Sequence, residues 1–175
     1  MQGWAEPARA LPLNWGSYPD RYGWGLALIV GGGIHLQGSN TYTLPFLLVG
    51  TTALTVGWGI MPASGGRRIA AALLGLLAQW LLLTGPQSMW VLVSLVLAWL
   101  IVRHRPWSSY AVLALPLAYG FVAPRLFEEY RWMPVALALG IVIVIGSAWI
   151  ARAIAASCRP RLSAVSAAIP QRPRG

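Results

Sequence analysis

Of the 175 residues, 57% are apolar and 10% are charged, whereas a soluble domain has about 25% charged residues. This balance and several long uncharged runs argue against a soluble globular protein and predict an all-α, polytopic integral membrane protein with one transmembrane domain. The net charge of +9 comes from arginines at the ends of apolar runs. Their position indicates the positive-inside rule and contact with membrane lipids, not nucleic-acid binding.

The sequence contains no lysine, a bias typical of a GC-rich bacterial gene, which favours the bacterial inner membrane. The single cysteine, Cys158, excludes a disulfide or a cysteine-based metal site within the chain, and an idle thiol is favoured over palmitoylation. Residues 1–20 carry charges and three prolines, so they do not resemble a signal peptide. Membrane insertion would then depend on the first span.

Three regions are expected along the chain. Residues 1–21 are expected to form an interfacial or cytoplasmic tail, because prolines interrupt any long helix and aromatic residues suit the headgroup zone. Residues 22–151 predict a transmembrane helical bundle. Residues 152–175 hold five arginines and three prolines and predict a basic, mostly disordered cytoplasmic tail.

The bundle is predicted to contain about six short transmembrane helices. The first covers about 22 Å, less than the roughly 30 Å of a hydrocarbon core, so it is either a half-span or a helix extended by its polar flanks. Pro116 predicts a kink in the fifth. The six expected segments are Tyr22–Leu36, Leu44–Met61, Ile69–Leu83, Met89–Val102, Ser108–Val122 and Val135–Ala151.

The arginines predict the orientation of these spans. With both termini inside, eleven arginines lie on the cytoplasmic side and two lie outside, in the link between the fifth and sixth spans. A five-span alternative with a re-entrant first segment moves only the N-terminal tail to the outside, and it leaves nine arginines inside and four outside. The simplest topology is three successive hairpins, with the N- and C-termini both in the cytoplasm.

Four spans carry small residues four positions apart, a spacing that lets two helix backbones approach closely. These residues predict helix-packing faces, within the chain or toward partner subunits or other copies of it. They are Ala27 and Gly31, Ala53 and Gly57, Ala71 and Gly75, and Ala136 and Gly140.

The centres of the predicted spans contain no Asp, Glu, Arg or Lys. Since a charge in the membrane is costly and is usually retained for function, this argues against a proton-coupled pump and against an enzyme with paired carboxylates. The sequence also lacks a nucleophile elbow, a zinc-binding His-Glu-x-x-His helix and a phosphate-binding P-loop. We therefore predict no catalytic residue, no metal site and no cofactor.

Five polar residues are the candidate ligand-binding groups, and all are expected at or toward the outer side. His35 near the end of the first span could titrate, bind a metal or bind an anionic headgroup, but an interfacial hydrogen bond is the simpler interpretation. Gln79 could hold a substrate or bond to a neighbouring helix. The acidic pair could bind a cation or pair with nearby arginines. The candidates are His35, Asn40, Gln79, Glu128 and Glu129.

Three functions are compatible with this sequence. The first is a non-enzymatic membrane subunit that packs with partner proteins or with itself. The second is a small transporter or ligand-binding module with an outer-facing polar site, which requires a water-filled cavity between the first, third and fifth spans. The third is a lipid-directed enzyme, which requires His35 to lie within hydrogen-bond reach of Glu128 or Glu129.

Overall fold

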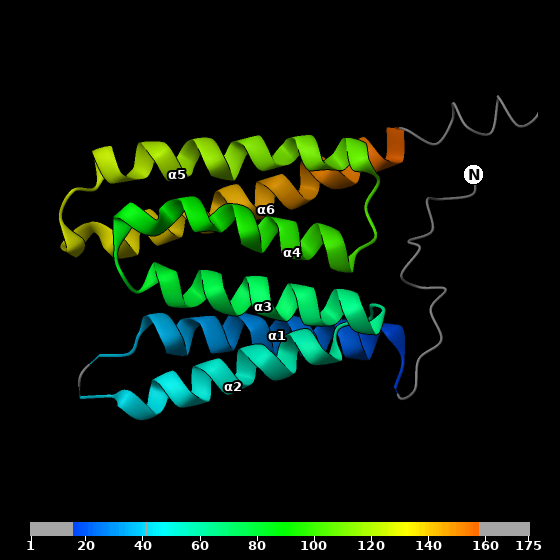
Figure 1. Cartoon of the computed structure of the whole chain (residues 1–175), viewed down its shortest axis with the longest axis horizontal. Coiled ribbons are helices and arrows are strands. Elements are labelled where there is room, and N and C mark those ends of the chain that lie inside the picture. Colours follow the sequence, from blue (N-terminus) through cyan, green and yellow to red (C-terminus); the bar gives the residue numbers. More distant parts are fainter. Residues whose placement is uncertain (1–15, 41, 158–175) are drawn as a thin grey trace, which may run out of the picture.

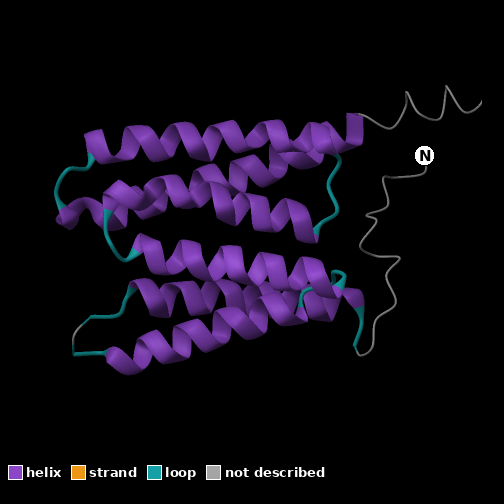
Figure 2. Cartoon of the chain, viewed as in Figure 1, coloured by secondary structure: helices purple, strands orange, loops and turns teal. Residues whose placement is uncertain are grey.

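The computed structural model describes residues 16–40 and 42–157, and over this part it consists of helices and connecting turns without strands (Figures 1 and 2). This confirms the predicted all-helical class with six helices. Short 3₁₀ segments, η2 (Pro86–Val91), η3 (Trp107–Leu113) and η4 (Tyr130–Trp132), lead into the last three. The six are α1 (Tyr18–Gln37), α2 (Leu44–Ile60), α3 (Gly65–Leu82), α4 (Leu92–Val102), α5 (Ala114–Leu126) and α6 (Met133–Ser157).

The helices run back and forth along one axis as three successive hairpins (Figure 1). The start of α1, the α2–α3 link, the α4–α5 link and the end of α6 lie at one end of the bundle. The other three links lie at the opposite end. In space, α1, α2 and α3 form one side, while α5 and α6 lie beyond α4 on the other.

The first helix is longer than expected. It begins at Tyr18, where the Ser17 side chain accepts a hydrogen bond from the Asp20 backbone N–H, and continues through its glycines to Gln37. Its 20 residues correspond to about 30 Å. The expected limits Tyr22–Leu36 were therefore too short. Of the two alternatives, the structure has the helix extended by its polar flanks.

Two other helices also differ from their expected limits. Pro116 does not interrupt a helix, because it stands in the first turn of α5, directly after η3, where a missing N–H is tolerated. The proline inside the helix is Pro124, and α5 continues to Leu126. Helix α6 continues to Ser157, so the first six residues of the expected C-terminal tail are helical. Cys158 and the remainder of that tail lie outside the described residues.

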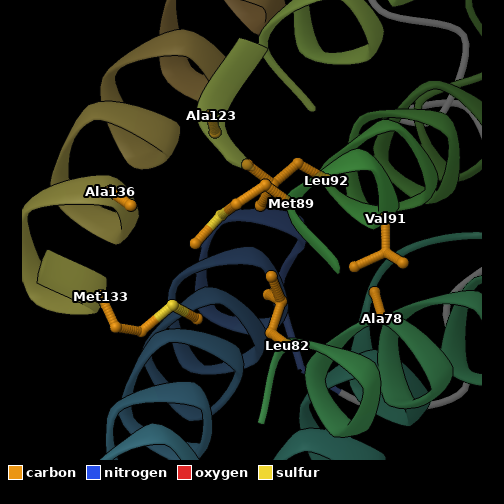
Figure 3. Close-up of a cluster of buried hydrophobic side chains, with 8 residues drawn as sticks. All are labelled: Ala78, Leu82, Met89, Val91, Leu92, Ala123, Met133 and Ala136. Atoms are coloured by element: carbon orange, nitrogen blue, oxygen red, sulfur yellow. The ribbon is translucent and has the colours of Figure 1, made fainter. Parts of the chain in front are cut away.

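The hydrophobic core combines alanines with larger Leu, Val and Met side chains. Its largest cluster joins α3 and η2 to the last three helices, with Met89 and Met133 reaching into its centre (Figure 3). The cluster consists of Ala78, Leu82, Met89, Val91, Leu92, Ala123, Met133 and Ala136. A second cluster, which includes Trp58, Met61, Ala71 and Ala98, connects α2, α3 and α4.

Large apolar side chains also point outward on α1, α2, α3, α5 and α6, whereas α4 has no exposed residue. On α3 they form a stripe in which Ile69, Leu73 and Leu77 are 64%, 64% and 59% exposed. Two segments, Trp107–Leu126 and Tyr130–Ser157, are long and apolar enough to cross a membrane. Two more apolar helices, Leu44–Ile60 and Pro86–Val102, are shorter.

Candidate functional site

The contact between α1 and α2 is made through two facing pairs of glycines. A Cβ atom on Gly32 would lie 2.7 Å from the carbonyl oxygen of Gly50, and one on Gly57 would lie 2.9 Å from that of Gly25. Both distances are too short for a real Cβ, so only glycine fits. Each helix places its two glycines seven residues, or two turns, apart on one face. The two antiparallel backbones therefore touch directly.

Most of the expected small residues lie in contacts between helices of this chain. Ala53 and Gly57 face α1, and Ala71 is fully buried. A Cβ on Gly75 would lie 2.9 Å from Cε2 of Trp58 in α2. On α6, Ala136 is fully buried, and a Cβ on Gly140 would lie 2.7 Å from the Leu92 side chain.

Ala27 and Gly31 are the exception, because α1 turns them away from the bundle. Ala27 is exposed, and a Cβ on Gly31 would meet nothing within 4 Å. At about 100° per residue, Ala27 lies about 200° around the helix from Gly25. As an intrachain packing face this pair was wrong. The seven-residue spacing shared by α1 and α2 was the signal that would have identified the buried face.

Gln79 forms hydrogen bonds with a neighbouring helix. The Gln37 side-chain amide of α1 donates to the Gln79 carbonyl oxygen at 2.9 Å and to its Oε1 at 3.1 Å. Gly33 leaves room for this contact, since a Cβ there would lie 3.4 Å from the Gln79 side-chain nitrogen. The one strongly polar group inside α3 thus joins α3 to α1.

His35 and Asn40 make local contacts near the α1–α2 link. A ring nitrogen of His35 lies 2.8 Å from the Gly31 carbonyl oxygen, and the ring packs edge-on against Phe46. The Asn40 side chain accepts a hydrogen bond from the Tyr42 backbone at 2.8 Å. Both residues therefore support the helix end and the turn.

The acidic pair lies on a different part of the bundle. Glu128 and Glu129 are exposed in the α5–α6 link, and Glu129 forms an ion pair with Arg131 at 2.6 Å. Figure 1 places this link across the bundle from α1. The structure therefore does not gather the five polar candidates into one site. Over the described ranges, no group of three or more His, Cys, Asp or Glu residues could hold a metal ion.

The hollows beside α2 are also unlike a polar substrate site. One, of about 450 Å³, opens between α1 and α2 and is lined by Leu28, Leu48, Val49, Thr52, Ala53 and Val56. Another, of about 290 Å³, is lined by Leu44, Leu47, Leu48, Thr51 and Trp80. Their walls are almost entirely apolar.

The strongest concentration of charge in the described residues lies at the end of the bundle that holds the α2–α3 and α4–α5 links. The sequence predicted arginines on this side of the membrane, but none of them was among the candidate site residues. We call this end of the bundle the basic end and define it by Arg21, Arg67, Arg68, Arg103, His104 and Arg105. The same end includes the carboxylate of Asp20, which accepts a hydrogen bond from Ser17 at 2.5 Å.

Several of these arginines bind the carbonyl ends of helices. Arg21 donates to the Ile60 carbonyl at 3.0 Å. Arg68 donates to Gly59 at 3.1 Å and to Ala63 at 2.9 Å. A cation is favourable there because the C-terminal end of a helix carries a partial negative charge. These contacts fix the arginines in place, but carbonyl dipoles do not cancel their full charges.

Two other arginines of the basic end join α4 to neighbouring helices. The Arg103 guanidinium lies 4.5 Å and 4.9 Å from the ring centres of Tyr22 and Trp99 and donates to the Tyr18 hydroxyl. Arg67 donates to the Ile101 carbonyl at 3.2 Å. The backbone N–H of His104 bonds to that same carbonyl at 3.3 Å, so Arg67 and His104 are neighbours.

His104 has an unusual conformation within this cluster. Its φ of +52° is uncommon for a residue other than glycine, and its Nε2 is buried without a hydrogen-bond partner. Desolvation, and secondarily the charge of Arg67, lower the pKa of His104. The imidazole is therefore neutral at pH 7, and the arginines provide the charge.

Comparisons with known proteins identify no family for this chain: no protein-family model, no curated protein and no solved structure matches it.

Proposed function

We propose that this chain is a multi-pass protein of the bacterial inner membrane, with six spans and the basic end in the cytoplasm. We further propose that it is a non-enzymatic subunit, which packs against partner proteins or other copies of itself through the outward face of α1. The observation that carries the membrane assignment is the outward orientation of its large apolar side chains.

The degree of burial supports a membrane environment. Of the most apolar 18 residues in Trp107–Leu126 and in Tyr130–Ser157, only 28% and 22% are buried, whereas the core helix of a soluble protein is mostly buried. A soluble monomer rarely exposes a continuous apolar patch of more than a few hundred Å². Lipid would cover these outward side chains at no cost.

Exposed aromatic residues near both ends of the bundle also fit a membrane, where such rings occupy the interfaces. Trp24 and Trp107 lie toward the basic end, while Tyr42, Trp80 and Trp132 lie toward the opposite end.

The arginines favour a cytoplasmic basic end. Six of the eight arginines in the described residues lie at or near it, and the other two lie at or next to the α5–α6 link. This distribution follows the positive-inside rule.

Cysteine labelling tests this orientation. In a Cys158→Ser background, we expect Tyr42→Cys to react with a membrane-impermeant thiol reagent in intact cells. Tyr42 is 96% exposed in the α1–α2 link. We expect Ser64→Cys, in the exposed α2–α3 link, to react only after the membrane is permeabilised. Labelling of both sites in intact cells, or the reverse pattern, would contradict the proposed topology.

The outward face of α1 supports the subunit assignment. Gly23, Ala27 and Gly31 follow one another at four-residue intervals, and a Cβ on either glycine would meet nothing within 4 Å. A glycine in a helix costs about 1 kcal/mol relative to alanine, and no contact within the chain requires these two. Close approach of another membrane helix would give them a role.

The test is the mass of the native assembly in a mild detergent. We expect Ala27→Leu combined with Gly31→Leu to remove partners or copies that co-purify with the wild-type chain. Gly146→Leu on α6 is the matched control, because a Cβ there also meets nothing within 4 Å. An assembly unchanged by the α1 variant, or a wild-type chain that purifies alone, would refute the proposal. Gly75→Leu is unsuitable, since it would disturb Trp58 within the fold.

A further inference from the structure

The basic end carries more charge than the support of its helices requires. Arg67 is exposed and bonds to one carbonyl of α4. Its neighbour Arg68 lies close enough to Arg21 for their like charges to repel. These positive charges stand on both sides of the first turn of α3: Arg67 reaches toward α4 and Arg68 toward α2. An anion bound at this turn beside Arg68 would offset the repulsion between Arg68 and Arg21.

We infer that the basic end binds the phosphate of an anionic phospholipid at the first turn of α3, with Arg67 and Arg68 as its principal charged ligands. This inference rests on the proposed membrane location. Arginine is well suited to the task because its planar guanidinium group presents several donors to phosphate oxygens.

The first turn of α3 is open to such a ligand. Gly65 and Gly66 are exposed, and a Cβ on either would meet nothing within 4 Å. The Ser64 side chain does not cap the helix, and the turn contains no acidic residue. The partial positive charge of the helix N-terminus therefore adds to that of the two arginines.

The surface below this turn indicates that the phosphate belongs to a lipid. Ile69, Leu73 and Leu77 form an exposed apolar stripe that continues along the face of Gly65 and Gly66, since residues three and four apart share a helix face. An acyl chain on this stripe would place its headgroup at the exposed first turn, beside Gly65 and Gly66. A free phosphate would make no use of the stripe.

Native mass spectrometry of the detergent-purified full chain provides the test. We expect phosphatidylglycerol to be retained in preference to phosphatidylcholine, and Arg67→Gln to weaken that retention about fivefold, as is typical for the loss of one arginine near an anionic surface. Arg125→Gln is the control, because Arg125 is an exposed arginine near a helix end on the opposite side of the bundle. It should retain the lipid like the wild-type chain.

A second variant covers the possibility that Arg67→Gln fails to fold. Gly66→Asp occupies open space, and an acidic residue in the first turn favours a helix, while its charge repels phosphate. It should keep the wild-type thermal midpoint and lose the lipid preference. Equal retention in the wild-type chain and both variants, or no preference for phosphatidylglycerol, overturns the inference. Displacement of the lipid by millimolar inorganic phosphate would show that the site takes a free anion.

The outcomes also separate this inference from the proposed function. The lipid experiment does not depend on which side of the membrane holds the basic end. If cysteine labelling supports the topology and lipid retention is unselective, only the lipid site is wrong. If the retention is selective and the labelling reversed, only the orientation is wrong.

Discussion

Replacing Gly120 with alanine should destabilise the fold strongly. A Cβ at this position of α5 would lie 2.6 Å from the backbone nitrogen of Trp90 and also overlap the Trp90 Cα. Both atoms belong to the backbone of η2, so no side-chain rotation relieves the clash, and η2 and α5 must separate. Overpacking of a core typically costs 1–3 kcal/mol and sometimes more. Because a backbone must move, we expect about 3 kcal/mol.

The measurement is the thermal midpoint of the detergent-solubilised protein, followed by size-exclusion chromatography after heating. Gly146→Ala is the matched control, since Gly146 lies within α6 and its Cβ would meet nothing within 4 Å. The control should keep or raise the midpoint, because alanine is favoured over glycine in a helix by about 1 kcal/mol. Equal midpoints for the two variants would show that η2 does not touch α5 as described.

The number of helices and their order were predictable from the sequence because each apolar run is separated from the next by a proline, glycine or polar turn. The arginines were equally informative. Their clustering at alternate links predicted that the α2–α3 and α4–α5 links lie at the same end, and the hairpins of Figure 1 place them so. Both patterns depend only on the order of residues along the chain.

The ends of the helices were less predictable, because polar residues at these positions are satisfied by tertiary contacts. Asp20 and Arg21 look like the end of a tail in the sequence. In the structure, Asp20 bonds to Ser17, and Arg21 is buried against the Ile60 carbonyl. Both therefore fit within a helix, and the carbonyl that binds Arg21 lies 39 positions away in the sequence.

The rotation of α1 about its axis was not predictable from hydropathy, because its inward and outward faces are both apolar. Only residue size distinguishes them, and α1 has glycines on both faces, at Gly25 and Gly32 inward and at Gly31 outward. The four-residue spacing of Ala27 and Gly31 pointed to the outward face, whereas the seven-residue spacing of Gly25 and Gly32 matches the glycine spacing of α2. The contacts of the polar candidates were unpredictable for another reason, because the sequence does not show which distant groups meet in the fold. Gln37 donates hydrogen bonds to Gln79, while His35 and Asn40 form hydrogen bonds with residues close to them in the sequence.

Adjacent glycines on α1 should respond to alanine in opposite directions. A Cβ on Gly32 would lie 2.7 Å from the Gly50 carbonyl oxygen and 2.8 Å from the Leu54 backbone nitrogen, whereas one on Gly31 would meet nothing within 4 Å. We expect Gly32→Ala to push α2 away and to cost about 2–3 kcal/mol. Gly31→Ala should be neutral or stabilising by up to about 1 kcal/mol. The measurement is again the thermal midpoint in one detergent.

These two variants share helix, depth and chemistry, so detergent and helix propensity affect both alike. A difference in midpoint between them therefore reports the rotation of α1 against α2. The reverse order would mean that Gly31 faces α2 and that the outward face proposed for partner contact is the buried one. Gly50→Ala provides an independent check from the other helix, because its Cβ would lie 2.7 Å from the Gly32 carbonyl oxygen. If α1 and α2 meet through these glycines, its loss of stability should match that of Gly32→Ala.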